Sequence, residues 1–314
     1  MTNTLYYGDN LATLRQRIKD ETVDLCYIDP PFNSKRNYNQ IYNNIGNEDR
    51  AQAQAFVDTW TWDHEAQRGF QEILANDTGR FQPQTIELLK GLRNVLKEGS
   101  LLAYLVSITL RVVEIHRALK PTGTFFLHCD PTSSHYLKLV LDGVFCSQGG
   151  DFLNEIIWCY NVGGKSKNHF ARKHDVLFWY AKGNDYYFDG TVAGLKRETG
   201  DKSFGGKMGV DEEGRRYQDK LVKKSGKYYR YYLDDPKIPE DWWTDINSIQ
   251  SQSAERIGYP TQKPEALMER IVKTCSKDGD TILDALSFSE IGSVPDLAMK
   301  CDGKWVQGCK NLRC

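Results

Sequence analysis

The chain has 314 residues, 40% of them hydrophobic and 26% charged, which is enough apolar residue for a sizeable core and excludes bulk disorder. We expect one large domain with a smaller inserted or appended part. The net charge of −1 excludes a polycation, so any surface that binds nucleic acid must be a local patch.

The N-terminal segment and the cysteines indicate the compartment. The first ten residues lack the basic and apolar regions of a signal peptide, and the longest apolar run, residues 101–110, is far shorter than the roughly 20 residues of a membrane span. None of the eight cysteines forms a CxxC pair. We therefore expect a soluble, cytoplasmic protein with reduced thiols, no membrane contact and no metal site.

Apolar strands alternate with helical patterns from the start of the chain. Residues 4–7 predict a short strand, and a helical pattern with Leu11, Leu14 and Ile18 follows it. Residues 23–28 predict a strand that is apolar on both faces. Such strands, separated by helices, are typical of a parallel sheet covered on both sides.

The later segments continue this α/β pattern. Residues 33–80 are polar and predict a long loop with some helix. The other predicted elements are helices over 83–119, over 133–145 and after Pro264, and strands within 120–130, 154–160, 174–182, 279–286 and 304–309.

A basic, tyrosine-rich stretch interrupts the globular pattern. Residues 191–231 carry eleven Lys or Arg against six Asp or Glu, a balance of +5, together with several tyrosines and glycines. A second basic run covers residues 163–174. These stretches indicate an inserted segment whose cations suit phosphates, although a solvated surface is the ordinary alternative for a run of charge.

The strand over 23–28 ends on Asp29-Pro30-Pro31-Phe32, at the position where open parallel sheets bind ligands. The Asp29 carboxylate accepts hydrogen bonds, the prolines fix φ and aim their carbonyls, and Phe32 offers a flat face. This set suits a planar group with an amine, because two acceptors would stabilise the positive charge that develops as the amine nitrogen forms a bond. A Pro-Pro turn without function is the alternative.

Five segments, in order, resemble the amino-group DNA methyltransferases, which methylate adenine N6 or cytosine N4. The chain order is similar to the permuted, beta-type arrangement of that family, and the resemblance covers most of the chain. The segments are YYGDNLATL (6–14), DPPF (29–32), LKPTGTFFLHCDPTSSHYLK (119–138), NEIIWCY (154–160) and YPTQKPEALMERIV (259–272).

The resemblance implies a Rossmann-like α/β fold that binds S-adenosylmethionine and takes a flipped base into its pocket. Asp29 and the Pro30 carbonyl would hold the amine, Pro31 would stiffen the turn, and Phe32 would stack on the base. The cytosine-N4 enzymes of the family usually begin this motif with serine, so Asp29 favours adenine.

On the cofactor side, the resemblance assigns four residues. Asp9 matches the position that contacts the adenine of the cofactor, although an ordinary solvated turn is the alternative. Thr261 and Lys263 match the segment near its methionine end, where a helix N-terminus and a lysine suit a carboxylate. Asp284 ends the strand that should precede the glycine-rich turn.

The segment after Asp284 departs from the family. Residues 282–300 place Glu290 where glycine normally lets the backbone approach the cofactor, and Pro295 falls where a helix should run. A variant cofactor site, an inactive DNA-binding relative, and a scrambled or truncated reading from about Leu286 all explain this change. The abruptness of the change favours the last, and resequencing the coding region for another frame with a glycine-rich motif tests it.

The predicted organisation is a catalytic part over 1–160, an inserted target-recognition region over 161–256, and a cofactor-binding part of the same domain over 257–314. The partner is double-stranded DNA, and the resemblance leaves open a homodimer and a cognate restriction enzyme. The residues predicted to contact DNA are Lys165, Lys167, Arg172, Lys173, Lys223, Lys224 and Arg230.

The sequence thus predicts an S-adenosylmethionine-dependent DNA methyltransferase acting on adenine N6. A catalytically impaired DNA-binding relative, a cytosine-N4 enzyme and an RNA amino-methyltransferase stay open as alternatives.

Overall fold

The computed structural model describes residues 4–6, 8–32, 36–39, 54–58, 60–161, 165–195, 206–222, 225–250, 252–256, 262–285 and 304–307. The chain forms two compact units. The larger contains Met1–Phe188 and Asp241–Cys314, and the smaller contains Asp189–Glu240.

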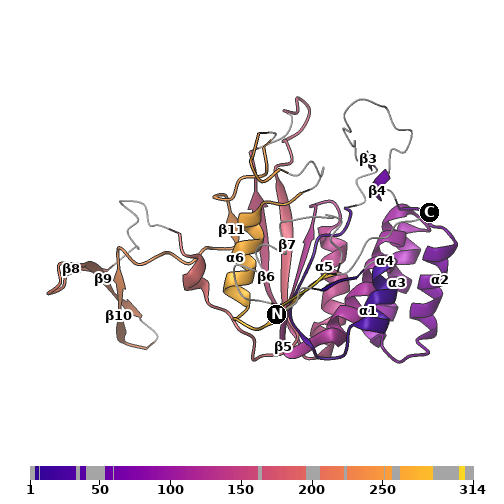
Figure 1. Cartoon of the computed structure of the whole chain (residues 1–314), viewed down its shortest axis with the longest axis horizontal. Helices are drawn as coiled ribbons and strands as arrows, with labels where there is room; N and C mark the ends of the chain where they lie inside the picture. The colour runs from indigo at the N-terminus through magenta and orange to yellow at the C-terminus, as the bar shows by residue number, and fades with distance from the viewer. Residues whose placement is uncertain are drawn as a thin grey trace. The chain divides into compact units, whose positions relative to one another are not determined.

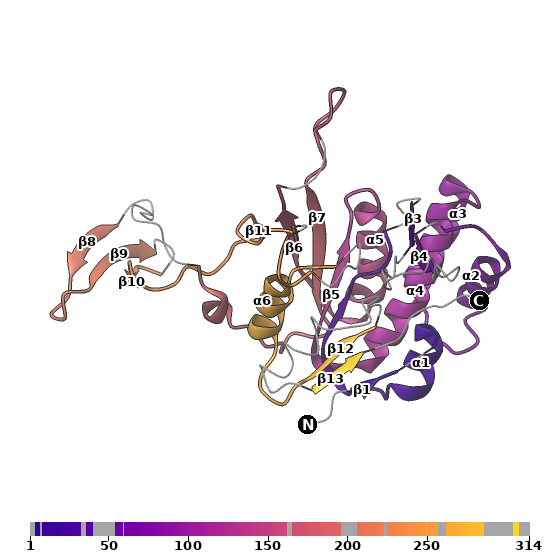
Figure 2. The ribbon, with the colours of Figure 1, turned by 45° about the horizontal axis from the view of Figure 1, so that its top comes forward.

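The larger unit is built on a central sheet with the strand order β1-β13-β12-β2-β5-β7-β6-β11 (Figures 1 and 2). All neighbours run parallel except β7, which is antiparallel to β5 and β6. The strands are β1 (Thr4–Leu5), β2 (Val23–Ile28), β5 (Leu119–Cys129), β6 (Asp151–Cys159), β7 (His174–Ala181), β11 (Trp242–Trp243), β12 (Thr281–Asp284) and β13 (Lys304–Gln307). The mostly parallel α/β sheet confirms the predicted fold class.

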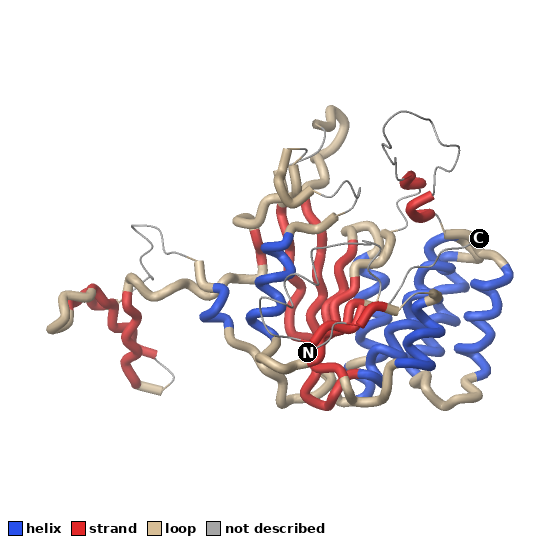
Figure 3. Tube along the Cα trace, in the orientation of Figure 1, coloured by secondary structure: helices blue, strands red, loops and turns tan. Residues whose placement is uncertain are grey.

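Helices cover both faces of this sheet, with α6 on one side and the other helices on the opposite side (Figures 1 and 3). A short 3-10 helix, η1 (Cys146–Gln148), follows α5. The helices are α1 (Asn10–Arg17), α2 (His64–Ala75), α3 (Pro83–Leu96), α4 (Ser100–Ala118), α5 (Ser134–Val144) and α6 (Glu265–Cys275).

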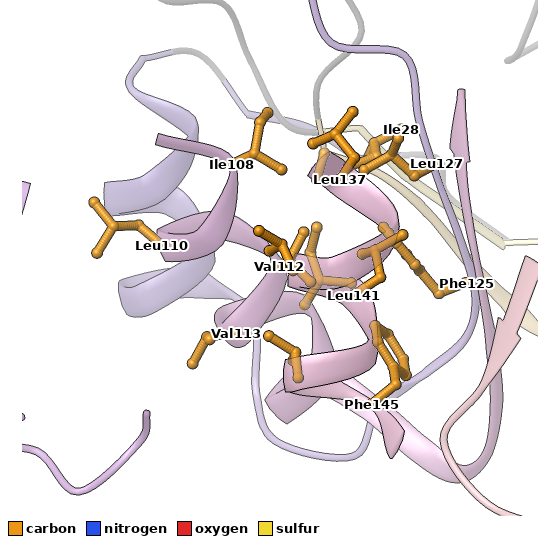
Figure 4. Packing of buried hydrophobic residues seen from close by; sticks show 14 of the residues in the cluster. Ile28, Ile108, Leu110, Val112, Val113, Phe125, Leu127, Leu137, Leu141 and Phe145 are labelled. Carbon is orange, nitrogen blue, oxygen red and sulfur yellow. The ribbon is translucent and has the colours of Figure 1, made fainter. Parts of the chain in front are cut away.

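Strand β2 is buried on both faces, as its apolar sequence predicted. Cys26 and Ile28 belong to the core shared with α1–α5, whereas Leu25 and Tyr27 belong to the core shared with α6. Figure 4 shows Ile28 beside Leu127 and facing helix side chains such as Leu137. A strand held from both sides keeps its end, and whatever follows it, in a fixed place.

Two sequence predictions were incomplete. The helix predicted over 83–119 is two helices, because Lys97 takes a left-handed φ of 57° and Gly99 caps α4. Residues 33–80, predicted as a long loop with some helix, contain α2 as that helix but also an antiparallel pair that was not predicted, β3 (Arg36–Asn39) and β4 (Gln54–Asp58). Tertiary pairing, which local patterns do not encode, explains the missed strands.

The smaller unit is a three-stranded antiparallel sheet in the order β10-β9-β8, preceded by the 3-10 helix η2 (Gly190–Ala193). Its strands are β8 (Lys207–Val210), β9 (Arg216–Val222) and β10 (Lys227–Tyr232). The sequence indicated an insertion here but not its strands. The domain boundaries given above stay a prediction.

No helix in the described ranges combines the length and the apolarity that crossing a membrane requires.

A buried histidine of α4 lies near the start of β5 and the end of β7, at the opposite end of the sheet from Asp29. His116 of α4 is 8% exposed and meets the Phe145 ring edge-on at 5.1 Å between centroids. It lines a cleft of about 630 Å³ together with Arg117 and Lys182. Burial, aided by the charge of Lys182, lowers the pKa of His116 from 6.5 to about 4.

We therefore expect the free energy of unfolding to fall on acidification between pH 6.5 and pH 4. In this window His116 is protonated in the unfolded chain but stays neutral in the folded chain. The difference in the pKa of His116 between the unfolded and folded states corresponds to about 3 kcal/mol of stability lost at the acid end of this window. Urea denaturation over this pH range measures it. His116→Gln should flatten the dependence, whereas His135→Gln, at an exposed position, should not. Equal acid sensitivity in His116→Gln and the parent would contradict the assignment.

Candidate active site

The Asp29–Phe32 segment follows β2 directly, at the carboxyl edge of the sheet. Pro30 is buried, and the Asp29 side chain is 21% exposed. The same edge carries the ends of β12, β5 and β6 and, because β7 is antiparallel, the start of β7. The motif therefore lies where side chains from five strands can converge on one ligand.

A lysine from a distant part of the chain closes on this motif. Lys263 lies just before α6, and its Nζ is 2.9 Å and 2.8 Å from the two carboxylate oxygens of Asp29. The same Nζ lies 4.8 Å from the centroid of the Phe32 ring. The structure thus brings together a residue predicted to bind the cofactor and two predicted to hold the base.

Behind Phe32 is a polar network that sequence reasoning missed. The Phe32 ring lies 5.7 Å from the fully buried His128 ring, tilted by 34°. His128 Nδ1 is 2.8 Å from the Tyr27 hydroxyl and Nε2 is 3.1 Å from Asp175 Oδ2. The Tyr160 hydroxyl donates to Asp175 Oδ1 at 3.1 Å. We call these four residues, Tyr27, His128, Asp175 and Tyr160, the buried network.

The donors in this network follow from the chemistry of its members. A carboxylate only accepts, so His128 Nε2 carries a proton and donates to Asp175, and in the neutral ring Nδ1 accepts from Tyr27. The available signals were a histidine in the apolar run FFLHC and an aspartate opening the apolar run DVLFWYA. Each polar residue inside a buried strand needs a partner, although the sequence does not say which.

Carboxylates gather around the end of β2. Burial raises the pKa of the Tyr27 hydroxyl, and the negative charges of Asp29, Asp284 and Asp175 raise it further. Burial alone would raise the pKa of Asp175, but the hydrogen bond and charge of His128, the charge of Lys263 and the Tyr160 hydroxyl outweigh it and lower that pKa. Asp175 is therefore an anion at neutral pH.

On the predicted cofactor side, Asp9 caps α1 by accepting from the Ala12 amide at 2.8 Å. Its second oxygen lies 3.7 Å from Arg111 Nη2. Arg111 also donates to the buried Asn10 at 2.7 Å, and Asn10 donates to the carbonyl of Ala285 at 3.1 Å. This chain of contacts ties Asp9 to the end of β12.

Asp284, the last residue of β12, is 3% exposed and pairs in register with Tyr27 of β2. Thr261 lies outside the described residues, as does the divergent stretch after Ala285, with Glu290 and Pro295. The predicted strand within 304–309 is present as β13, which pairs with β12 and β1. The origin of the divergent stretch stays a hypothesis.

The residues predicted to contact DNA fall in both units. Lys165, Lys167 and Arg172 are exposed on the loop between β6 and β7, and Lys173 of that loop donates to the carbonyl of Asn161 at 3.2 Å.

In the smaller unit, Arg230 is held by both oxygens of Asp219 at 2.9 Å, and its Cζ lies 3.5 Å from the centroid of the Tyr217 ring. The hydrogen bonds with Asp219 raise the pKa of Arg230. Lys223 and Lys224 lie outside the described residues.

Within the described ranges, no group of three or more His, Cys, Asp or Glu is placed to hold a metal ion.

The chain matches the N6_N4_Mtase family model, described as DNA methylase, over residues 23–306, and so belongs to that family. It is 22% identical to the DNA adenine methyltransferase YhdJ of Escherichia coli (strain K12) over 288 residues, 91% of this chain and 71% of that protein. It is 27% identical to the type II methyltransferase M.BglII of Bacillus subtilis over 222 residues, 69% of this chain but 54% of that protein.

Among solved structures, M1.HpyAVI is similar with a TM-score of 0.48 and 12% identity, covering 99% of this chain and 93% of its own. The PvuII DNA methyltransferase (cytosine-N4-specific) also has a TM-score of 0.48, with 10% identity, covering 99% of this chain and 83% of its own.

Replacing Asp175 by Asn should destabilise the fold by about 1–3 kcal/mol, because a buried hydrogen-bonding group of His128 loses its charged acceptor. Urea denaturation at neutral pH measures the change. Asp151→Asn, which neutralises an exposed carboxylate on β6, is the matched control and should leave stability within about 0.5 kcal/mol of the parent. Equal stability of Asp175→Asn and Asp151→Asn would argue against a structural role for the buried network.

Proposed function

We propose that this chain transfers a methyl group from S-adenosylmethionine to the exocyclic N6 of adenine in double-stranded DNA. The observation that carries the proposal is the Asp29–Phe32 segment at the carboxyl edge of the sheet, where Lys263 Nζ lies within 2.9 Å of both Asp29 carboxylate oxygens and 4.8 Å from the centroid of the Phe32 ring. Membership of the DNA methylase family supports it.

The acceptors of the motif act on the amine. A carboxylate has about four lone-pair sites, so Lys263 leaves acceptor capacity on both oxygens of Asp29 for an amine hydrogen. The rigid Pro30 carbonyl supplies a second acceptor. Together they would accept hydrogen bonds from the amine and stabilise the positive charge that builds on nitrogen as the N–CH3 bond forms and the S–CH3 bond of the donor breaks. The Asp29 carboxylate is the base placed to accept the proton that the methylated nitrogen then loses. Phe32, backed by His128, supplies the stacking face.

The charges at this edge fit the methyl donor. S-adenosylmethionine supplies an electrophilic methyl group and carries a net positive charge, from its sulfonium and amine against one carboxylate. Asp9, Asp284 and Asp175 give the edge a surplus of negative charge over Lys263 and Arg111. We assign Asp9, Asp284, Lys263 and Thr261 to the donor, with Lys263 suited to its carboxylate.

Adenine is favoured over cytosine by the aspartate that begins the motif, where the cytosine-N4 enzymes that this chain resembles usually have serine. The name of the E. coli relative, a DNA adenine methyltransferase, agrees with this choice.

DNA would meet the chain through residues 161–256, as the target-recognition region. Lys165, Lys167, Arg172 and Lys173 would contact phosphates from the larger unit, and Lys223, Lys224 and Arg230 from the smaller one. Since M.BglII is named a type II methyltransferase, a cognate restriction enzyme is a fitting partner. A homodimer remains an expectation from the resemblance.

Replacing Asp29 by Ala should lower methyl transfer to duplex DNA at least about 10²-fold, because one of the two acceptors on the amine is lost. Transfer of a radiolabelled methyl group measures the rate, and chromatography of digested product separates N6-methyladenine from N4-methylcytosine. Asp151→Ala is the control and should keep the parental rate. Undiminished transfer by Asp29→Ala would overturn the role of the motif.

The same preparation decides between the enzyme and its alternatives. Calorimetry with S-adenosylmethionine that shows no binding, combined with retained DNA binding, would identify a non-catalytic relative. Faster transfer to RNA than to duplex DNA would identify an RNA methyltransferase.

Neutralising Lys165, Lys167 and Arg172 together should weaken DNA binding and reduce the slope of log K against log [salt] by roughly 2–3, since each lost phosphate contact removes about 0.9. Arg230→Gln should have a smaller effect, because Asp219 already holds that guanidinium. Fluorescence anisotropy titrations at salt concentrations between about 50 and 200 mM measure this slope. An unchanged slope in the triple variant would remove this loop from the DNA interface.

A further inference from the structure

An aromatic side chain on the loop between β6 and β7 is left in solvent. Phe170 is 98% exposed, the highest value among the large exposed hydrophobic residues of the described ranges, where Val95 follows at 75%. Burying a phenylalanine ring lowers the free energy, so a ring that lies wholly in solvent would stabilise a complex with a partner that covers it.

The loop holds this ring outward. The Ser166 hydroxyl oxygen accepts from the amides of Asn168 and His169 at 3.3 Å and lies 2.9 Å from His169 Nδ1. This turn stands directly before Phe170. At the base of the loop, the Tyr160 amide donates to the carbonyl of Lys173 at 3.0 Å. Figure 2 shows the described part of the connection between β6 and β7, residues 165–173, projecting well beyond the ends of these strands.

The surroundings of the ring are cationic. Residues 161–173 contain Lys165, Lys167, Arg172 and Lys173, and no Asp or Glu. Within the described ranges, no ion pair engages Lys165, Lys167 or Arg172. An apolar ring among unneutralised cations fits a partner with an anionic exterior and an apolar interior. Duplex DNA has both, as phosphates outside and stacked bases inside.

The loop also starts at the candidate active site. Tyr160, the first residue after β6, donates to Asp175 near the start of β7, and Asp175 accepts from His128, against which Phe32 lies. The loop that carries Phe170 is therefore anchored in the same buried network that supports the base-stacking face. A duplex held by this loop would meet the chain at the same edge of the sheet as the motif, because the end of β6 and the start of β7 lie at the edge where β2 ends.

We propose that Phe170 inserts into the base stack of duplex DNA and fills the gap left when the target base turns toward Asp29 and Phe32. This rests on the proposed function, because it presumes that the base leaves the stack. Apolar side chains that wedge between base steps unstack them, and a base must leave the duplex before its amine can be reached. Phe170 thus offsets part of the cost of extrusion, while the neighbouring lysines hold the backbone.

The first experiment compares Phe170→Ala with Lys167→Ala on recognised duplex DNA and on the same duplex mismatched at the target adenine. Phe170→Ala should lower kcat/KM about 10- to 100-fold on paired DNA and recover to within about threefold of the parent on mismatched DNA, where extrusion costs less. Lys167→Ala should lower kcat/KM by the same factor on the paired and on the mismatched duplex. Parental activity of Phe170→Ala on paired DNA, or an equal loss on both substrates, would overturn the proposal.

The second experiment needs no methyl transfer. Phe170→Trp is titrated with a short duplex that carries an abasic site opposite adenine, and Val95→Trp, at an exposed position on α3, is the control. Emission of the new indole should be quenched and its accessibility to acrylamide should fall at saturation, whereas the control should not respond. An unchanged indole in Phe170→Trp, or a change that depends only on protein concentration, would overturn insertion.

The two experiments separate the proposal from the function on which it rests. If the parent shows no methyl transfer but the indole of Phe170→Trp is quenched, the insertion stands and the enzymatic assignment fails. If the parent methylates DNA and the indole does not respond, the enzyme stands and the insertion fails.

Discussion

The ion pair between Asp29 and Lys263 is the contact on which the candidate site depends. It joins the end of β2 to the residue just before α6, two points separated by 234 positions in the chain, at 2.8–2.9 Å and in a half-buried setting. An exposed ion pair contributes little to the free energy of folding. Removing one partner of a half-buried pair, however, leaves the other charge poorly compensated. The pair therefore fixes where the carboxylate and the lysine lie relative to Phe32.

The buried network gives this arrangement a rigid floor. Tyr27, His128 and Asp175 come from three different strands, β2, β5 and β7, so their hydrogen bonds cross the sheet at the edge where the ligand would lie. Buried polar networks in which every member has a partner restrict the packing around them to one arrangement. Because the Phe32 ring lies against His128, its position is restricted as well. On the proposed function, this restriction would hold the stacking face in place for the base.

The sequence predicted what is local and missed what pairs across distance. Three features depend on residues that are consecutive in the sequence, and the structure has all of them. They are the apolar strand β2, its Asp-Pro-Pro-Phe end and the helix after Pro264. The buried network joins residues 101 and 47 positions apart, and nothing in one sequence says that His128 would meet Tyr27 and Asp175. The pairing of Lys263 with Asp29 was missed for the same reason. The break at Lys97 was missed because the apolar pattern runs on through it, while the backbone turns.

Segregation of charge reconciles a net charge of −1 with two oppositely charged ligands. The carboxylates around the end of β2 form an acidic edge that is largely withdrawn from solvent, whereas Lys165, Lys167 and Arg172 of the loop between β6 and β7 are exposed. Burial makes the acidic edge effective at short range against a cationic methyl donor, while salt screens it from a polyanion farther away. On the proposed function, the exposed cations would act on phosphates, and salt would weaken that attraction. On the proposed function, the exposed cations would attract DNA while the buried carboxylates would face the methyl donor.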